Sequence, residues 1–166
     1  QLSHPHPAVR REVVKSLGKI GGPKAHRLLI SALEHEDEEV KRLAIRILGQ
    51  AASREAMRFA TPQMLQIISQ KNPFGRKNAL FKEVITVLGS LRAAVAVPQL
   101  EQLLKRRAWF ARAKNDELSV RAARALGQIG TERAVEIVRE GARDRRRVVR
   151  MVCEQTIKSV RAASEG

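Results

Sequence analysis

Apolar residues recur at every fourth position in four segments of the chain, and each of these runs stops beside a glycine. A spacing of four places the side chains on one face of a helix, so each segment predicts an amphipathic helix with one buried face. We expect the glycine to end that helix by adopting a positive φ after the last turn. The apolar columns with their glycines are Val9/Val13/Leu17/Gly18, Val40/Ala44/Leu48/Gly49, Leu80/Val84/Leu88/Gly89 and Leu118/Ala122/Leu126/Gly127.

A second apolar run follows three of these glycines and opens at Ala25, Ala96 and Ala134. Each repeat therefore predicts a helical hairpin, which cannot bury its apolar stripe alone and must stack on its neighbours. The column returns once more as Val149/Cys153/Ile157, which predicts a last single helix. The predicted fold is an all-α solenoid, in one domain, of about four hairpins plus a C-terminal helix. The predicted repeats span residues 5–35, 37–71, 76–115 and 116–143, and the last helix spans 145–163.

Two segments carry the repeat most clearly: VRREVVKSLGKIGGPKA, from Val9, and LSVRAARALGQIGTERA, from Leu118. Their shared pattern, V-R-x3-[VA]-x3-L-G-x-I-G-x4-A, resembles the HEAT-like repeats of the phycobilisome-lyase type. The resemblance implies a right-handed superhelix with the first helices on the convex face and the second helices lining the concave face. It does not imply one function, because repeats of this type serve many partners.

Two repeats are longer than the first, and insertions in solenoids often form binding loops. In the second repeat, Thr61 and Pro62 predict the N-cap and first turn of the second helix, with Met57 and Phe59 packed over the hairpin. The third repeat gains the segment RRAWFARAKND between its second helix and the next first helix. Trp109 and Phe110 in this segment can form either an apolar plug over a gap between repeats or an exposed anchor ringed by cations.

The chain carries 32 Lys and Arg against 17 Asp and Glu, a net charge of +15, which favours acidic proteins, nucleic acid or anionic lipid headgroups as partners. Solubility alone is the plain alternative. A second alternative applies to Arg10, Lys41 and Arg150, which can pair with Asp37, Asp116 and Asp144 at the turns between repeats. Three further arginines lie at the start of the last helix, where the helix dipole disfavours cations. The predicted partner-binding residues are Arg106, Arg107, Trp109, Phe110, Arg112, Lys114, Arg145, Arg146 and Arg147.

The sequence contains no phosphate-binding glycine loop, nucleophile elbow or cluster of metal-ligating residues. Cys153 falls in a core column, which predicts an inert buried thiol. We therefore expect a non-enzymatic scaffold, without metal or cofactor, that binds a partner protein with an acidic surface. Sequence-independent nucleic-acid binding through basic edges is the first alternative, although the mixed charges of the second helices predict no deep basic groove. An accessory role resembling that of bilin lyases is the second.

The first predicted helix has apolar residues on more than one side, including Val9, Val14 and Ile20. Terminal repeats normally need a polar outer face, so we expect the chain to belong to a longer protein. No apolar run reaches the length of a membrane helix, and the single cysteine favours a cytoplasmic location.

Overall fold

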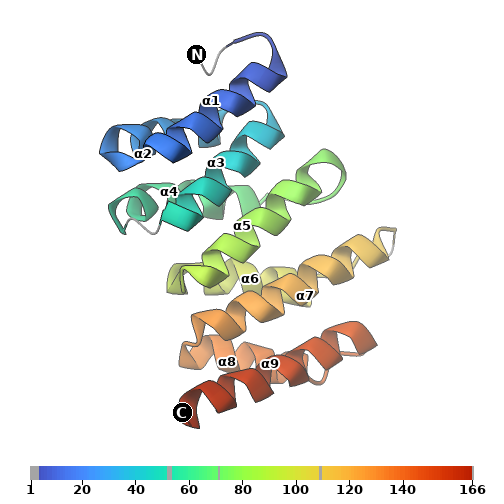
Figure 1. The fold of residues 1–166 in the computed structure, drawn as a ribbon. Coiled ribbons are helices and arrows are strands. Elements are labelled where there is room, and N and C mark those ends of the chain that lie inside the picture. Colours follow the sequence, from blue (N-terminus) through green and yellow to red (C-terminus); the bar gives the residue numbers. More distant parts are fainter. Residues whose placement is uncertain (1–3, 52–53, 71, 109, 166) are drawn as a thin grey trace. The chain divides into compact units, whose positions relative to one another are not determined.

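The computed structural model describes residues 4–51, 54–70, 72–108 and 110–165 (Figure 1). All regular secondary structure within these ranges is helical. The chain divides into two compact units, Gln1–Val87 and Leu88–Gly166, and the division falls inside one helix, α5 (Asn78–Ser90). No helix among the described residues is long and apolar enough to cross a membrane.

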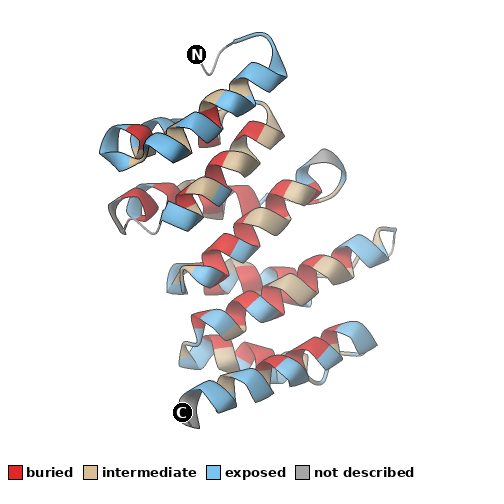
Figure 2. Cartoon of the chain, viewed as in Figure 1, coloured by how far each residue is buried: buried red, intermediate tan, exposed pale blue. Residues whose placement is uncertain are grey.

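Unit 1 contains two helical hairpins. The first pairs α1 (Pro7–Ile20) with α2 (Gly22–Ser31), which ends in the short 3-10 helix η1 (Ala32–Glu34). The second pairs α3 (Glu38–Ala51) with α4 (Arg54–Ile68), and a 3-10 turn η2 (Gly75–Lys77) then leads into α5. The helices α1 and α3 pack against each other in one layer, and α2 and α4 pack in a second (Figure 1). This layering buries the apolar faces where the helices meet (Figure 2).

Unit 2 repeats this arrangement. After the end of α5 come η3 (Ala94–Ala96), α6 (Val97–Lys105), α7 (Arg112–Ile129), α8 (Glu132–Gly141) and α9 (Arg147–Glu165). The long helices α7 and α9 pack against each other, and α6 and α8 form the second layer. Leu118, Leu126 and Val149 of the predicted columns are buried. The column is less buried in α1, where Val9 is exposed and Val14 is buried instead, and at Ile157 of α9, which is half-buried.

The predicted role of the column glycines is wrong, because all four lie inside helices and none has a positive φ. They instead allow successive first helices to approach closely. A methyl group built on Gly18 would lie 2.8 Å from Cγ2 of Ile47, and one built on Gly49 would lie 2.8 Å from Cγ1 of Val87. In unit 2, a methyl group on Gly89 would lie 2.8 Å from Cα of Ala125. One on Gly127 would overlap the methyl group of Thr156.

The helices end one or two residues after the column glycine, and the third residue after it takes a positive φ in three of the repeats. Gly21 and Gly130 take positive φ values of 66° and 69°, and their N–H groups donate to the carbonyls of Leu17 and Leu126. Arg92 stands at the same place in its repeat and adopts φ 51° without being a glycine. Glycine is the residue that occupies this backbone region without steric cost, so Arg92 bears that cost in a turn where its N–H donates to the carbonyl of Gly89 at 2.9 Å.

The predicted start of the second helix at Thr61 and Pro62 is also wrong. The helix α4 begins at Arg54, and Pro62 lies inside it. The Thr61 hydroxyl donates to the carbonyl of Met57, one turn earlier, at 2.7 Å. Thr61 is therefore a residue of the helix interior whose side chain bonds to the preceding turn, and not an N-cap. Met57 is buried as predicted, whereas Phe59 is exposed.

Candidate partner-binding edge

The two predicted basic clusters meet at one edge of unit 2. The connection between α6 and α7 lies beside the connection between α8 and α9, because Arg107 pairs with Asp144 at 3.5 Å. Arg146 also donates to the carbonyl of Arg106 at 3.1 Å. The N-terminal ends of α7 and α9 accordingly point to the same side of the unit (Figure 1).

Arg146 holds these two connections together. Its side chain is only 14% exposed and donates to the carboxylates of Asp116 (3.1 Å) and Asp144 (3.0 Å). It donates further to the Ser119 hydroxyl at 3.0 Å and to the carbonyl of Leu104 at 2.7 Å. With these acceptors on several sides, Arg146 forms part of the framework of the edge rather than of its exposed surface.

Asp144 is the carboxylate at the centre of this framework. Burial alone would raise the pKa of Asp144, but hydrogen bonds from the side chain and backbone N–H of Arg146, with the charges of Arg146 and Arg107, lower it. Burial likewise acts to lower the pKa of Arg146, and the bonds to Asp144 and Asp116 outweigh it and raise the pKa. Both groups are therefore charged at neutral pH.

The remaining cations of the two clusters face solvent. Arg112, Lys114, Arg145 and Arg147 are exposed, as is Arg143, which the sequence analysis did not select. Among the described residues these five have neither an ion pair nor a side-chain hydrogen bond. Phe110 is 70% exposed on the same connection. Trp109, which the sequence predicts to be either an apolar plug or an exposed anchor, lies outside the described residues. We define the basic edge as Arg107, Phe110, Arg112, Lys114, Arg143, Arg145 and Arg147.

Two helices present their N-terminal ends at the basic edge. The helix α7 begins at Arg112, and its N-cap residue Ala111 makes no side-chain cap bond. Neither α7 nor α9 has an acidic residue in its first turn. The positive end of the helix dipole favours an anion at such positions, although at α9 the Asp144 carboxylate already accepts from the backbone N–H of Arg146 at 2.7 Å. The exposed cations therefore reinforce the attraction for an anion instead of cancelling it.

The RRAWFARAKND segment is partly helical, because α7 starts earlier than the repeat pattern predicts. Arg112 and Lys114 are thereby fixed on a helix rather than on a loop. Asn115 is buried and donates to the carbonyl of Arg106 at 2.9 Å, and buried Ser119 donates to the carbonyl of Leu103 at 3.1 Å. Both were missed, although a polar residue beside a core column is the signal that could have revealed them.

Of the three cations predicted to pair with an aspartate at a turn between repeats, one does so. Arg10 pairs with Asp37 at 2.9 Å. Lys41 pairs instead with Glu38 at 3.2 Å, within its own helix. Arg150 donates to the backbone carbonyl of Asp144, since the carboxylate is taken by Arg146.

Cys153 is buried in the core of unit 2, as its column predicts. Burial, with a smaller effect from the charge of Asp144, raises the pKa of its thiol to about 11. The thiolate is therefore scarce at neutral pH, which agrees with an inert core residue.

Comparison with known proteins identifies the family. A family model for HEAT repeats matches residues 27–114, which is more than half of the chain, and a model for the PBS lyase HEAT-like repeat matches residues 9–35 and 120–144. The chain belongs to the HEAT-repeat family. This confirms the resemblance seen in the sequence, and HEAT repeats often mediate protein interactions. No curated protein sequence matches the chain.

Solved structures agree with this HEAT-repeat fold. The crystal structure of one engineered protein is similar with a TM-score of 0.58 at 19% identity, over 96% of this chain and 46% of that protein. A second engineered protein is similar with a TM-score of 0.52 at 16% identity, over 97% of this chain and 76% of that protein. The chain thus spans about half the length of the first. At this identity the likeness concerns the fold alone, and the predicted all-α solenoid class is confirmed.

Proposed function

We propose that the chain is a non-enzymatic interaction module whose basic edge binds an acidic segment of a partner protein. The observation that carries the proposal is the set of exposed, unpaired cations at the starts of α7 and α9. Asp116 and Asp144, the carboxylates of the same two helix starts, pair with the part-buried Arg146. The edge therefore keeps its positive charge for a ligand.

The exposed ring of Phe110 suits the same role. Arginine and aromatic residues are enriched at the centres of protein interfaces, where they contribute most of the binding free energy. An acidic segment with apolar residues between its carboxylates would meet both kinds of contact at this edge. Steering by the +15 charge would speed its association at low salt.

The test compares two triple variants of equal charge on the same two helices. The edge variant is Arg112→Glu, Lys114→Glu and Arg147→Glu, and the matched control is Arg124→Glu, Lys158→Glu and Arg161→Glu. All six residues are exposed, and each variant replaces two arginines and one lysine. Long-range attraction falls equally in both, so a difference between them reports the edge itself. Thermal melts followed by circular dichroism show whether each variant is folded.

The probe is a fluorescein-labelled peptide of ten glutamates, and binding is followed by fluorescence anisotropy. We expect the edge variant to lose at least about tenfold in affinity relative to the control, since each charge-assisted contact is worth about 1.5 kcal/mol or more. Equal losses in the two variants would contradict the proposal.

Nucleic acid is the other polyanion that the net charge of +15 favours. A labelled 20-base-pair duplex measured with the same variants separates the two functions. The proposal expects the peptide to bind the edge specifically and the duplex to bind weakly, with losses that are alike in the two variants. Tight duplex binding near physiological salt, lost selectively in the edge variant, would replace the protein partner by a nucleic acid.

A further inference from the structure

A second candidate binding surface lies in unit 1, away from the basic edge residues in sequence. A groove of about 490 Å³ runs between α1 and α3 beside Gly18, the point where the two helices approach. Its volume is in the range of ordinary ligand sites. Leu29, Leu43 and Ile47 provide an apolar floor, and the lining residues include no carboxylate.

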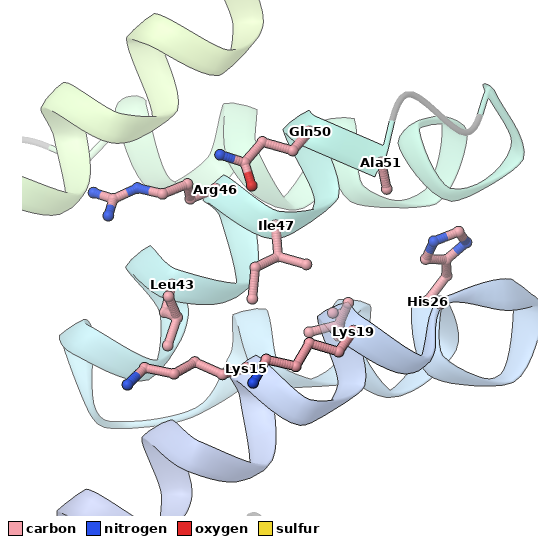
Figure 3. A pocket seen from close by; sticks show the side chains of 11 residues that line it. Lys15, Lys19, His26, Leu43, Arg46, Ile47, Gln50 and Ala51 are labelled. Atoms are coloured by element: carbon pink, nitrogen blue, oxygen red, sulfur yellow. The ribbon is translucent and has the colours of Figure 1, made fainter.

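Cations surround this floor. Figure 3 shows Leu43 and Ile47 pointing from α3 toward α1, with Lys15 and Lys19 along the rim formed by α1. His26 of α2 lines one end of the groove.

The charge of these cations is only partly compensated. Arg46 turns away to pair with Glu83 at 2.6 Å, and Lys15 pairs with the exposed Glu12 at 3.2 Å. Lys19 and His26 have no ion pair or side-chain hydrogen bond among the described residues. An anion that enters the groove therefore meets Lys19 directly.

Unit 2 contains a groove at the same place in the repeat that shares part of this chemistry, because Arg92 and Arg124 line it and Arg124 corresponds to Lys15. This groove lies between α7 and α9 beside Gly127 and has about the same volume, 500 Å³. In the repeat register Lys19 corresponds to Gln128 there, and Ile47 corresponds to Thr156. A groove with a cation on its rim is thus a property of the repeat, whereas Lys19 beside the apolar Ile47 distinguishes the groove beside Gly18.

We propose that the groove between α1 and α3 binds a short acidic peptide segment of a partner protein, with an apolar side chain on the floor and an adjacent carboxylate on Lys19. Charge complementarity selects this occupant, because an uncharged apolar ligand would leave Lys19 unused and a bare anion would leave the floor of Leu43 and Ile47 uncovered. The site does not require the basic edge.

The test uses a fluorescein-labelled peptide of sequence Leu-Glu-Glu-Leu-Glu-Glu, followed by anisotropy. One comparison peptide replaces each Glu by Gln, and another replaces each Leu by Ala. The protein variants Lys19→Gln and Ile47→Thr give the groove beside Gly18 the residues of its counterpart in unit 2. Lys24→Gln is the matched control, since Lys24 is exposed on α2 and does not line the groove.

We expect each change in the peptide and each groove variant to weaken binding by about tenfold, and Lys24→Gln to change it by less than about twofold. Thermal melts verify the fold of each variant. If the Ile47→Thr variant does not fold, the binding measured with Lys19→Gln and with the two comparison peptides tests the proposal. Binding that is equal for the Gln peptide, or equal in Lys19→Gln and Lys24→Gln, would overturn the proposal. So would binding to phosphatidylserine vesicles without binding to the peptide.

The basic-edge triple variant separates this site from the proposed function. It should weaken the Leu-Glu peptide no more than its matched control does, because the groove residues are unchanged. A selective loss in the edge variant would place the peptide at the basic edge and leave the groove without a ligand. Conversely, Lys19→Gln should leave binding of the ten-glutamate peptide unchanged within about twofold.

Discussion

The first helices α3 in unit 1 and α9 in unit 2 begin with opposite charges, although they occupy the same place in the repeat. Glu38 and Glu39 start α3, and Arg147 starts α9. In unit 1 three carboxylates at this turn have cationic partners: Asp37 pairs with Arg10, Glu38 with Lys41 and Glu39 with Arg42. In unit 2 the carboxylates Asp116 and Asp144 bind Arg146, and the surrounding arginines remain in solvent.

This difference shows which positions the fold constrains and which it leaves free. Both turns need one arginine that bridges successive repeats, and both have it, as Arg10 and as Arg146. The exposed positions around that arginine are not fixed by packing. Unit 1 fills them with residues that complement the helix dipole, whereas unit 2 fills them with residues that oppose it. We infer that unit 2 gives up some stability at this edge to keep a surface for an anionic ligand.

The largest difference between the units is expected on removing the bridging arginine. Arg146→Met leaves Asp116 without its cation and Asp144 with only the longer pair to Arg107, and it should lower the free energy of unfolding by about 3 kcal/mol, since poorly paired buried charges are costly. Arg10→Met affects one carboxylate, Asp37, and should cost about 1 kcal/mol. Urea unfolding measures both. Equal costs would mean that the additional acceptors of Arg146 add nothing.

The pH dependence of stability should be steeper at the turn in unit 2. The pKa of Asp144 is lowered in the folded chain, so its contribution is present above the unfolded value of about 3.9 and is lost as the pH falls through the lower folded value. Burial raises the pKa of Asp37, but Arg10 and two backbone N–H groups lower it overall, so the sign is the same. The Asp144 side chain is less exposed, at 10% against 21%.

Urea unfolding of the Asp144→Asn and Asp37→Asn variants between about pH 5 and about pH 2 tests this. Wild type should lose stability with acid relative to both variants. The difference in free energy of unfolding between wild type and variant should shrink more with acid for Asp144→Asn than for Asp37→Asn. A profile for Asp144→Asn that runs parallel to wild type would show that its carboxylate is not coupled to folding.

The column glycines should differ in how well an added methyl group is tolerated. Gly89→Ala meets the backbone of Ala125, which cannot rotate away, so we expect a net cost of about 2 kcal/mol. Gly18→Ala meets side-chain atoms of Ile47, with Cγ2 at 2.8 Å and Cδ1 at 3.1 Å, and none of its nearest contacts is a backbone atom of the neighbouring helix. The higher helix propensity of alanine, worth about 1 kcal/mol, offsets much of the steric cost of that contact. The free energy of unfolding should therefore change by less than about 0.5 kcal/mol. Thermal and urea unfolding of the two variants, side by side, would refute this if Gly18→Ala cost as much as Gly89→Ala.

The smallest predicted effects concern the helix starts themselves. Arg147→Glu should stabilise unit 2 by about 0.5 kcal/mol, because a carboxylate in the first turn interacts favourably with the dipole. Glu38→Arg should destabilise unit 1 by a similar amount, with the added loss of its pair with Lys41. Thermal melts at low salt check both signs. If Arg147→Glu lowers the melting temperature, the arginines at this edge are there for stability rather than for a ligand.

The sequence predicts the helices and their stacking because these depend on the apolar period, which is local and strong. Leu48, Leu88 and Leu126 are buried where their columns place them. The glycine role was misjudged since a helix end and a close helix contact both favour glycine, and only the neighbouring helix distinguishes them.

The candidate site was predictable only in part. Clustered charge revealed Arg112, Lys114, Arg145 and Arg147, which the structure places at one edge. The inward role of Arg146 was not visible, because its acceptors come from residues 30 and 42 positions earlier in the chain. Charge patterns along a sequence do not show which member of an arginine run is turned toward the core.

The most direct test of the basic edge is to map the ten-glutamate peptide on the ¹⁵N-labelled protein by chemical-shift perturbation. We expect the largest shifts at residues 106–116 and at residues 143–150, with both sets saturating at one dissociation constant, because the two connections form one surface. Shifts confined to one connection, or two sets with different dissociation constants, would contradict a single binding edge.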